Sequence, residues 1–199
     1  MAVASDTEYL EVILGAIRVC ADYRPRFGHG RAAGFTVAEF RQLYQGDPFY
    51  SWFGLDNALM YAAHRAAGGM TSVYRQIGIG CQWVFNRVLR DSLNIDGDAA
   101  NWSYKVPGAT GGRERTLSLD ARIPTAALQA GSRADAVRSW LAEAAKRLEL
   151  TRKAARSLQG AVFEVRQGYK SKDSKRQNAD VSNAASAYAH QYLPVVVLL

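Results

Sequence analysis

The segment from Gly160 to Leu199 constrains the fold more than any other stretch of this chain. Apolar and polar side chains alternate over Ala161 to Gln167, which predicts a half-buried strand with Glu164 and Arg166 on one face. A polar, basic segment follows, then an Ala-rich helical stretch over 177–191, and then the wholly apolar run 193–199. The segment therefore predicts a strand, a basic loop, a helix and a buried strand, in that order.

Two more strands are predicted upstream, over 102–106 and 115–123, with a Gly-rich connection between them. Alternation in both runs is typical of a β-hairpin. In the second run one face is expected to hold the apolar residues Leu117, Leu119, Ala121 and Ile123. Asp120 is then expected on the opposite face, together with Ser118 and Arg122.

Helical periodicity dominates the rest of the chain. Capping-box spacing at Ser5 and Glu8, and again at Thr36 and Glu39, predicts two helix starts. Further helices are expected from Pro48, over about 55–65 ending at the 68–69 glycine pair, over 71–93, and from a Ser132 cap to about 157. We therefore predict a helical N-terminal region over 1–70 and an α/β domain over 71–199, in which one mixed sheet carries flanking helices.

The charge and composition limit the classes of partner. The chain has 199 residues and a formal net charge of +7, which favours an acidic partner, nucleic acid first and an anionic membrane surface second. Cys20 and Cys81 lie in apolar helical patterns and are interpreted as core residues. With no leader and no apolar stretch near 20 residues, we expect a cytoplasmic protein without a membrane span. Because the chain stops within its most apolar run, either the last strand is buried or the natural protein continues beyond Leu199.

Asp120 and Glu164 are the candidate catalytic acids. The predicted order of helix, three strands, helix and strand, together with the wording FEVRQGYKSKDSKRQNAD, resembles the PD-(D/E)XK nucleases and in particular the ApaLI-like type II restriction endonucleases. The resemblance implies a restriction-endonuclease-like αβββαβ core in which Asp120 and Glu164 bind Mg²⁺. It also implies sequence-specific hydrolysis of phosphodiester bonds in double-stranded DNA by a homodimer.

The third catalytic position has two candidates. Two residues after Glu164, where the family has Lys, this chain has Arg166, which stabilises negative charge but does not readily lose a proton. Lys170 is the alternative, if Gly168 bends the strand. A literal D-x-K at Asp173 to Lys175 is rejected because its flanks do not alternate as a strand does.

The basic loop is expected to contact the DNA backbone next to this centre. Its candidate residues are Lys170, Lys172, Lys175 and Arg176. The alternative function is a non-catalytic basic nucleic-acid-binding protein that uses the same loop. The basic residues between 138 and 156 are interpreted as a solvated helix face, and the aspartates at 96 and 98 as a turn and not a calcium loop. His29, His64 and His190 stand apart and match no metal or triad spacing.

Overall fold

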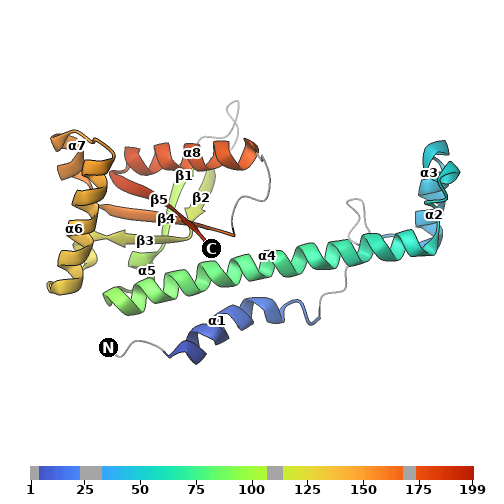
Figure 1. Cartoon of the computed structure of the whole chain (residues 1–199), viewed down its shortest axis with the longest axis horizontal. Coiled ribbons are helices and arrows are strands. Elements are labelled where there is room, and N and C mark those ends of the chain that lie inside the picture. Colours follow the sequence, from blue (N-terminus) through green and yellow to red (C-terminus); the bar gives the residue numbers. More distant parts are fainter. Residues whose placement is uncertain (1–4, 23–32, 107–113, 168–173) are drawn as a thin grey trace. The chain divides into compact units, whose positions relative to one another are not determined.

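The structure is a computed structural model of the chain, and it describes residues 5–22, 33–106, 114–167 and 174–199. These residues form eight α-helices, a short 3₁₀ helix and five strands (Figure 1). Contacts group the chain into two compact units, one formed by Met1–Ile13 with Gly80–Leu199 and the other by Leu14–Ile79. The expected mixed α/β architecture with a helical N-terminal region is therefore confirmed. Separate domains over 1–70 and 71–199 stay a prediction.

The unit over Leu14–Ile79 is helical. Helix α2 (Val37–Gln45) begins with the predicted capping box of Thr36 and Glu39, and Asp47 caps α3 (Pro48–Trp52), whose first residue is proline. Phe40 is fully buried between α2 and the start of α4, where the Tyr44 hydroxyl lies 2.7 Å from Nε2 of His64. The local capping rules therefore placed both short helices correctly.

Helix α4 (Ala58–Leu93) runs without a break through both glycines at 68 and 69. The predicted end of one helix there is therefore wrong. Glycine lowers helix propensity by about 1 kcal/mol but keeps its N–H group, so it does not end a helix as proline does. Near its middle, α4 lies close to α1 (Asp6–Arg18) because a Cβ at Gly80 would lie only 3.1 Å from Cα of Ile13.

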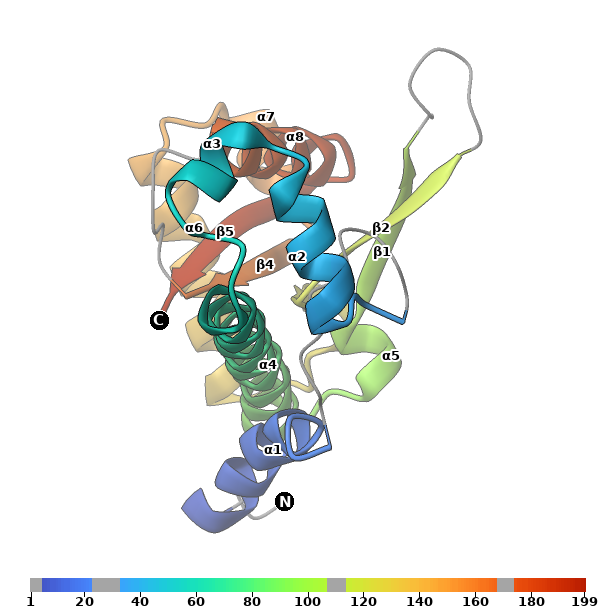
Figure 2. The ribbon, with the colours of Figure 1, turned by 90° about the vertical axis from the view of Figure 1, so that its right-hand side faces the viewer.

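The strands form two sheets. Strands β1 (Trp102–Val106) and β2 (Arg115–Leu119) make the predicted antiparallel hairpin. Strands β3 (Ala121–Pro124), β4 (Gly160–Arg166) and β5 (Tyr192–Leu198) make the second sheet in the order β3-β4-β5, with β3 antiparallel and β5 parallel to β4. Figure 2 shows β4 and β5 side by side. The prediction of one continuous sheet is wrong because pairing is interrupted at Asp120, between β2 and β3.

This interruption also changes which side of the sheet each residue faces. Leu119 packs in a cluster with Trp102, Val162 and Ala187, whereas Ala121 packs in a second cluster with Phe163. The expectation that Leu119 and Ala121 share one apolar face is therefore wrong. Strict alternation holds only within an uninterrupted strand, and one extra residue in the ladder moves the following side chains to the other face.

Helices cover both faces of the β3-β4-β5 sheet. On one face, Phe85 of α4 and Trp140 of α6 (Ser132–Arg147) lie against Phe163, with ring centroids 5.3 Å and 6.2 Å away. On the other face, α8 (Ser174–Ala189) packs Ala187 against Val162, and both residues are fully buried (Figure 1). The sheet therefore lies between two helical layers, as is usual in α/β proteins. Tyr192 and Leu193 at the start of β5 are buried, but Val196 and Leu198 are 45% and 58% exposed, so the expectation that the whole terminal strand is buried is wrong.

Several elements differ from the prediction. Helix α6 starts at Ser132, so Gly131 and not Ser132 is the cap, and it ends at Arg147 where Glu149 adopts a positive φ. Thr151 then caps a separate helix, α7 (Arg152–Ser157). The expected turn at the 96–98 aspartates contains α5 (Gly97–Ala100), capped by Asp96, and η2 (Thr125–Ala127) follows β3.

Gly160 provides a direct test of the β3–β4 pairing. Its φ is +153°, and an added Cβ would lie 1.9 Å from the carbonyl oxygen of Ile123 on β3. Gly131 has a similar φ of +147° but open space around it. We expect Gly131→Ala to lower the free energy of unfolding by about 1–3 kcal/mol from backbone strain alone. Gly160→Ala should lower it clearly more, as measured by urea unfolding, because β3 and β4 would also have to move apart to make room for the added Cβ. Equal losses would contradict this pairing.

Candidate active site

Asp120 lies where the polypeptide leaves β2 and enters β3. Its backbone N–H donates to the Phe163 carbonyl oxygen at 3.0 Å, although the Cα partner of Phe163 is Ala121. Two residues therefore oppose one, which is the count of a β-bulge, and bulges re-aim side chains. Here the Asp120 carboxylate turns toward β4, and its Oδ2 accepts a hydrogen bond from the Val165 N–H at 2.7 Å.

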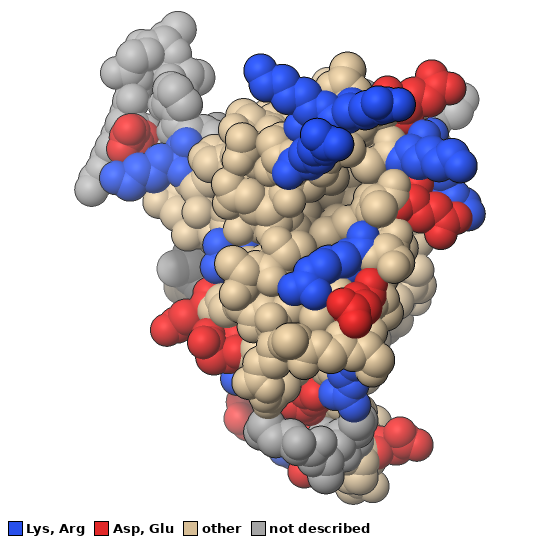
Figure 3. Space-filling view, turned by 90° about the vertical axis from the view of Figure 1, so that its left-hand side faces the viewer, with Lys and Arg blue, Asp and Glu red and all other residues tan. Residues whose placement is uncertain are grey.

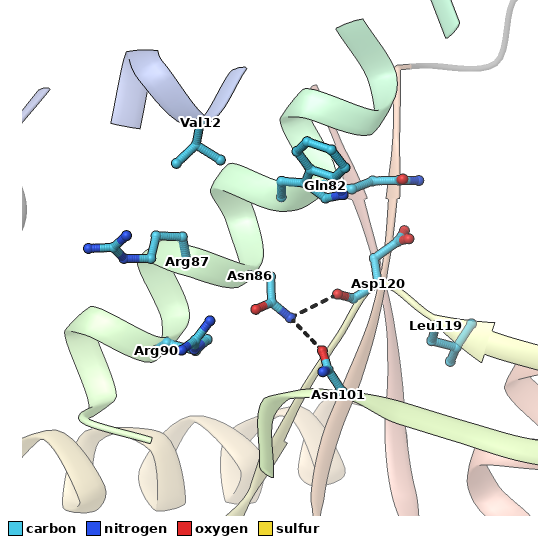
Figure 4. Close-up of a pocket in the computed structure, with 9 residues that line it drawn as sticks. Val12, Gln82, Asn86, Arg87, Arg90, Asn101, Leu119 and Asp120 are labelled. Carbon is cyan, nitrogen blue, oxygen red and sulfur yellow. Dashed lines mark hydrogen bonds between the residues drawn. The ribbon is translucent and has the colours of Figure 1, made fainter. Parts of the chain in front are cut away.

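Helix α4 fixes the other side of this bulge. The Asn86 side-chain amide donates to the Asp120 backbone carbonyl at 3.1 Å and to Oδ1 of Asn101 at 3.4 Å (Figure 4). Gln82, one turn earlier on α4, lies beside the Asp120 carboxylate and favours its charged form. Asp120 is therefore supported from α4 through its backbone carbonyl and from β4 through its carboxylate.

Glu164 and Arg166 project from β4 on the side that α8 covers. Nη2 of Arg166 lies 3.0 Å from Oε1 of Glu164 and 2.5 Å from Oδ1 of Asp180, which belongs to α8. The side chains of Glu164, Arg166 and Asp180 are only 15%, 20% and 10% exposed, respectively. The predicted pairing of a carboxylate and a guanidinium on one strand face is confirmed, and Asp180 joins it from a helix.

The charges of these groups are strongly coupled. Burial and the nearby Asp120 carboxylate raise the pKa of Glu164 from 4.5 to about 7, against the opposing effect of Arg166. Burial also raises the pKa of Asp120, although the Val165 N–H, Arg166 and Gln82 act in the opposite direction. Burial disfavours the Arg166 cation, but its hydrogen bond to Asp180 and the charges of the three carboxylates together raise its pKa. Arg166 therefore stays protonated. Among the described residues, it is the only arginine that contributes to the pKa shifts of Asp120 and Glu164.

The donor set suits a divalent cation. If Asp120, Glu164 and Asp180 were all ionised, they and the Arg166 guanidinium would carry a net charge of −2, which a divalent ion would balance. Mg²⁺ prefers oxygen ligands and is usually held by one or two carboxylates while it keeps several waters. Among the described residues, no three Asp, Glu, His or Cys side chains already converge on one point as a complete metal site. Asp120 and Glu164 would supply the one or two carboxylates that Mg²⁺ usually needs.

The other predicted site residues lie mainly elsewhere. Lys170 and Lys172 lie outside the described residues, as does His29. Lys175 and Arg176 belong to the first turn of α8. The sequence D-x-K at 173–175 therefore leads into a helix, and its rejection as a strand motif is supported. His190 contacts the Ser186 carbonyl oxygen, and His64 contacts Tyr44.

Asp180 is the residue that the sequence analysis missed. It lies on a helix stripe with Asn183, Ala184 and Ala187, spaced as residues on one helix face are. Asn183 accepts a 2.6 Å hydrogen bond from the Tyr104 hydroxyl, and Ala187 is fully buried, so this stripe faces the sheets. A single carboxylate on a stripe of small residues, at the spacing of one helix face, was the available signal.

A second basic region precedes β4 in the sequence. Helix α7 carries Arg152, Lys153 and Arg156, all exposed. Figure 3 shows Lys and Arg side chains gathered at the upper end of the face that includes α6 and α7. Their exposure agrees with the interpretation as a solvated face. Of the described helices, none is long and apolar enough to cross a membrane.

Comparisons with known proteins give no further identification. No family model, curated protein or solved structure matches this chain significantly. The functional argument therefore rests on the geometry around Asp120 and Glu164.

The raised pKa of Glu164 predicts how stability depends on pH. Between about pH 4.5 and 7 the unfolded chain has released the Glu164 proton while the folded protein retains it, so stability falls as pH rises through this window. We expect the unmodified protein to lose roughly 2–3 kcal/mol more than Glu164→Gln between these limits. Urea unfolding with a chelator measures the difference. Parallel pH profiles for the two proteins would show that the fold does not hold the Glu164 proton.

Proposed function

We propose that this protein is a metal-dependent endonuclease that hydrolyses phosphodiester bonds in double-stranded DNA. One observation carries the proposal: the bulge turns the Asp120 carboxylate onto the Val165 N–H, one residue from Glu164 on the adjacent strand. Phosphodiester hydrolysis needs an activated water and positive charge over the developing negative charge. Two acids on neighbouring strands beside a fixed guanidinium form a suitable set.

The arrangement of elements supports a PD-(D/E)XK assignment. Helix α4, strands β1, β2/β3 and β4, helix α8 and strand β5 follow in the αβββαβ order, with α6 and α7 between the two acids. The acids stand on the second and third strands of that order, as the resemblance implies. Sequence-specific cleavage of the type II restriction kind, and a homodimer acting on a symmetric site, belong to the same proposal.

Asp120 and Glu164 would hold Mg²⁺, which when bound supplies Lewis-acid stabilisation of the phosphoryl oxygens and activation of water. The bulge and the Val165 N–H orient Asp120. Burial raises the pKa of Glu164, so the folded protein keeps its proton near neutral pH, and a bound cation would displace that proton. Arg166 would stabilise negative charge that develops on the phosphate, with Asp180 fixing its orientation.

One observation favours the alternative of a non-catalytic nucleic-acid-binding protein. Arg166 already pairs with both Glu164 and Asp180, as in a purely structural ion pair. Nε of Arg166, however, is buried without a hydrogen-bond partner among the described residues. A buried unpaired donor is costly, which argues against an arrangement that serves stability alone. The endonuclease proposal accounts for both observations.

Removing either acid should abolish cleavage. Asp120→Asn keeps an oxygen that accepts from Val165, so the fold should persist while a metal ligand is lost. We expect Asp120→Asn and Glu164→Gln each to slow Mg²⁺-dependent plasmid cleavage by about a thousandfold, since such a metal contributes several kcal/mol. Duplex affinity should change by less than about tenfold. The double variant should be no slower than either single one.

Two exposed carboxylates serve as matched controls. Asp135→Asn and Glu143→Gln alter residues on α6 whose side chains are 73% and 59% exposed. Both variants should cleave at the unmodified rate. Cleavage that survives both Asp120→Asn and Glu164→Gln would show that the nuclease site is assigned to the wrong residues. Duplex binding that no chelator affects, with no cleavage by the unmodified protein, would leave the binding-protein alternative.

A second comparison assigns the third catalytic position. Because Arg166 lies beside Glu164 and Asp180, we expect Arg166→Ala to slow cleavage by about a hundredfold, the effect of losing a charged hydrogen-bond donor. Arg166→Lys should retain most of the activity, since a lysine reaches the same carboxylates and restores the family pattern. Lys170→Ala should cleave nearly normally. The reverse result, an inactive Lys170→Ala and an active Arg166→Ala, would assign the role to Lys170.

A further inference from the structure

An open pocket of about 510 Å³ lies on the α4 side of Asp120. Trp83, Arg87 and Arg90 of α4 line it, and Asn101 and Asp120 close it from the strand side. Figure 4 shows Asn86 between these two walls, bonded to both Asn101 and the Asp120 carbonyl. The volume of the pocket is within the range typical of small-molecule sites and far exceeds that of a phosphate ion.

Arg90 supplies an unneutralised positive charge in this pocket. Arg87 is paired with Asp91 at 2.8 Å, whereas Arg90 forms no ion pair within the described residues. Nε of Arg90 is also buried without a hydrogen-bond partner there. Gly97 packs on the guanidinium, since a Cβ at that position would lie 3.4 Å from Cζ of Arg90. A guanidinium that lines the pocket and has no ion-pair partner among the described residues is suited to an anionic ligand such as a phosphate.

Trp83 adds an aromatic surface to the same pocket. Its side chain is 51% exposed although it lies next to the amides of Gln82 and Asn86. A half-exposed indole beside neutral amides and a guanidinium suits a ligand that carries both a flat ring and a phosphate. A simple anion would leave the indole unused, and a purely apolar ligand would leave Arg90 unpaired.

We infer that the Trp83–Arg90 pocket binds one nucleotide of the substrate strand, with its phosphate at Arg90 and its base on Trp83. This inference rests on the proposed function and adds to it a binding subsite next to the phosphodiester that faces Asp120. Asn86 connects the two, because the same amide supports the Asp120 backbone and lines the nucleotide pocket.

Titration with free 2′-deoxynucleoside 5′-monophosphates, in the presence of a chelator, tests the pocket without requiring cleavage. All four nucleotides should quench tryptophan fluorescence and bind more tightly than inorganic phosphate. Arg90→Ala should weaken binding about tenfold. Trp83→Ala should remove the quenching and weaken binding about fivefold or more, while Trp83→Phe should retain most of the affinity. Nucleotide affinity that none of these variants changes would overturn the inference.

Two variants outside the pocket serve as controls. Arg138→Ala removes an exposed arginine of α6, and Trp52→Ala removes a tryptophan of α3 that is 84% exposed. Both should bind nucleotides as the unmodified protein does. Ultraviolet cross-linking of 5-bromo-deoxyuridine monophosphate to the unmodified protein needs no variant and should label the peptide that contains Trp83. Labelling only at other peptides would contradict the assignment.

The outcomes separate this inference from the proposed function. If Asp120→Asn stops cleavage while Arg90→Ala and Trp83→Ala leave nucleotide binding unchanged, the pocket assignment is wrong and the endonuclease stands. If nucleotides bind as expected but no cleavage occurs with Mg²⁺, the pocket stands and the endonuclease proposal is wrong.

Discussion

The hydrogen bond from the Val165 N–H to the Asp120 carboxylate connects the parts of this structure that matter for function. Strand pairing is interrupted at Asp120, so the Val165 N–H donates to a side-chain oxygen there and not to a backbone carbonyl. The same bulge sends Leu119 and Ala121 to opposite core clusters, which divides the strands into two sheets. A partly buried carboxylate needs such a donor because desolvation disfavours its charge. The bulge and the candidate catalytic acid are therefore one feature.

Charge balance explains why α8 belongs to the site. Glu164, Asp180 and Asp120 bring three acids to one guanidinium in a region that excludes most solvent. Like charges at low dielectric repel strongly, and the protein reduces this repulsion by keeping a proton on Glu164 near neutral pH. Binding a cation would remove the same repulsion. A carboxylate pKa raised by neighbouring acids is more typical of functional sites than of structural ion pairs.

Helix α4 supports both halves of the proposed substrate site. Gln82 and Asn86 contact Asp120, and Trp83 and Arg90 from the same turns line the adjacent pocket. A rigid helix fixes the separation between these groups more accurately than a loop does. Gly80 lets α1 approach this part of α4 closely, so Val12 of α1 completes the pocket wall.

The sequence by itself determined the local structure. Alternation predicted β4, capping residues predicted the starts of α2 and α3, and the positions of Asp120 and Glu164 marked two candidate acids, because these signals depend on neighbours along the chain. Only the tertiary structure decided that pairing breaks at Asp120, that Asp180 holds Arg166, that the pKa of Glu164 is raised, and that Asn101 and Asp120 close the pocket beside α4. Each of these depends on which strand and which helix meet in space, and residues far apart in the sequence carry no local signal of that meeting.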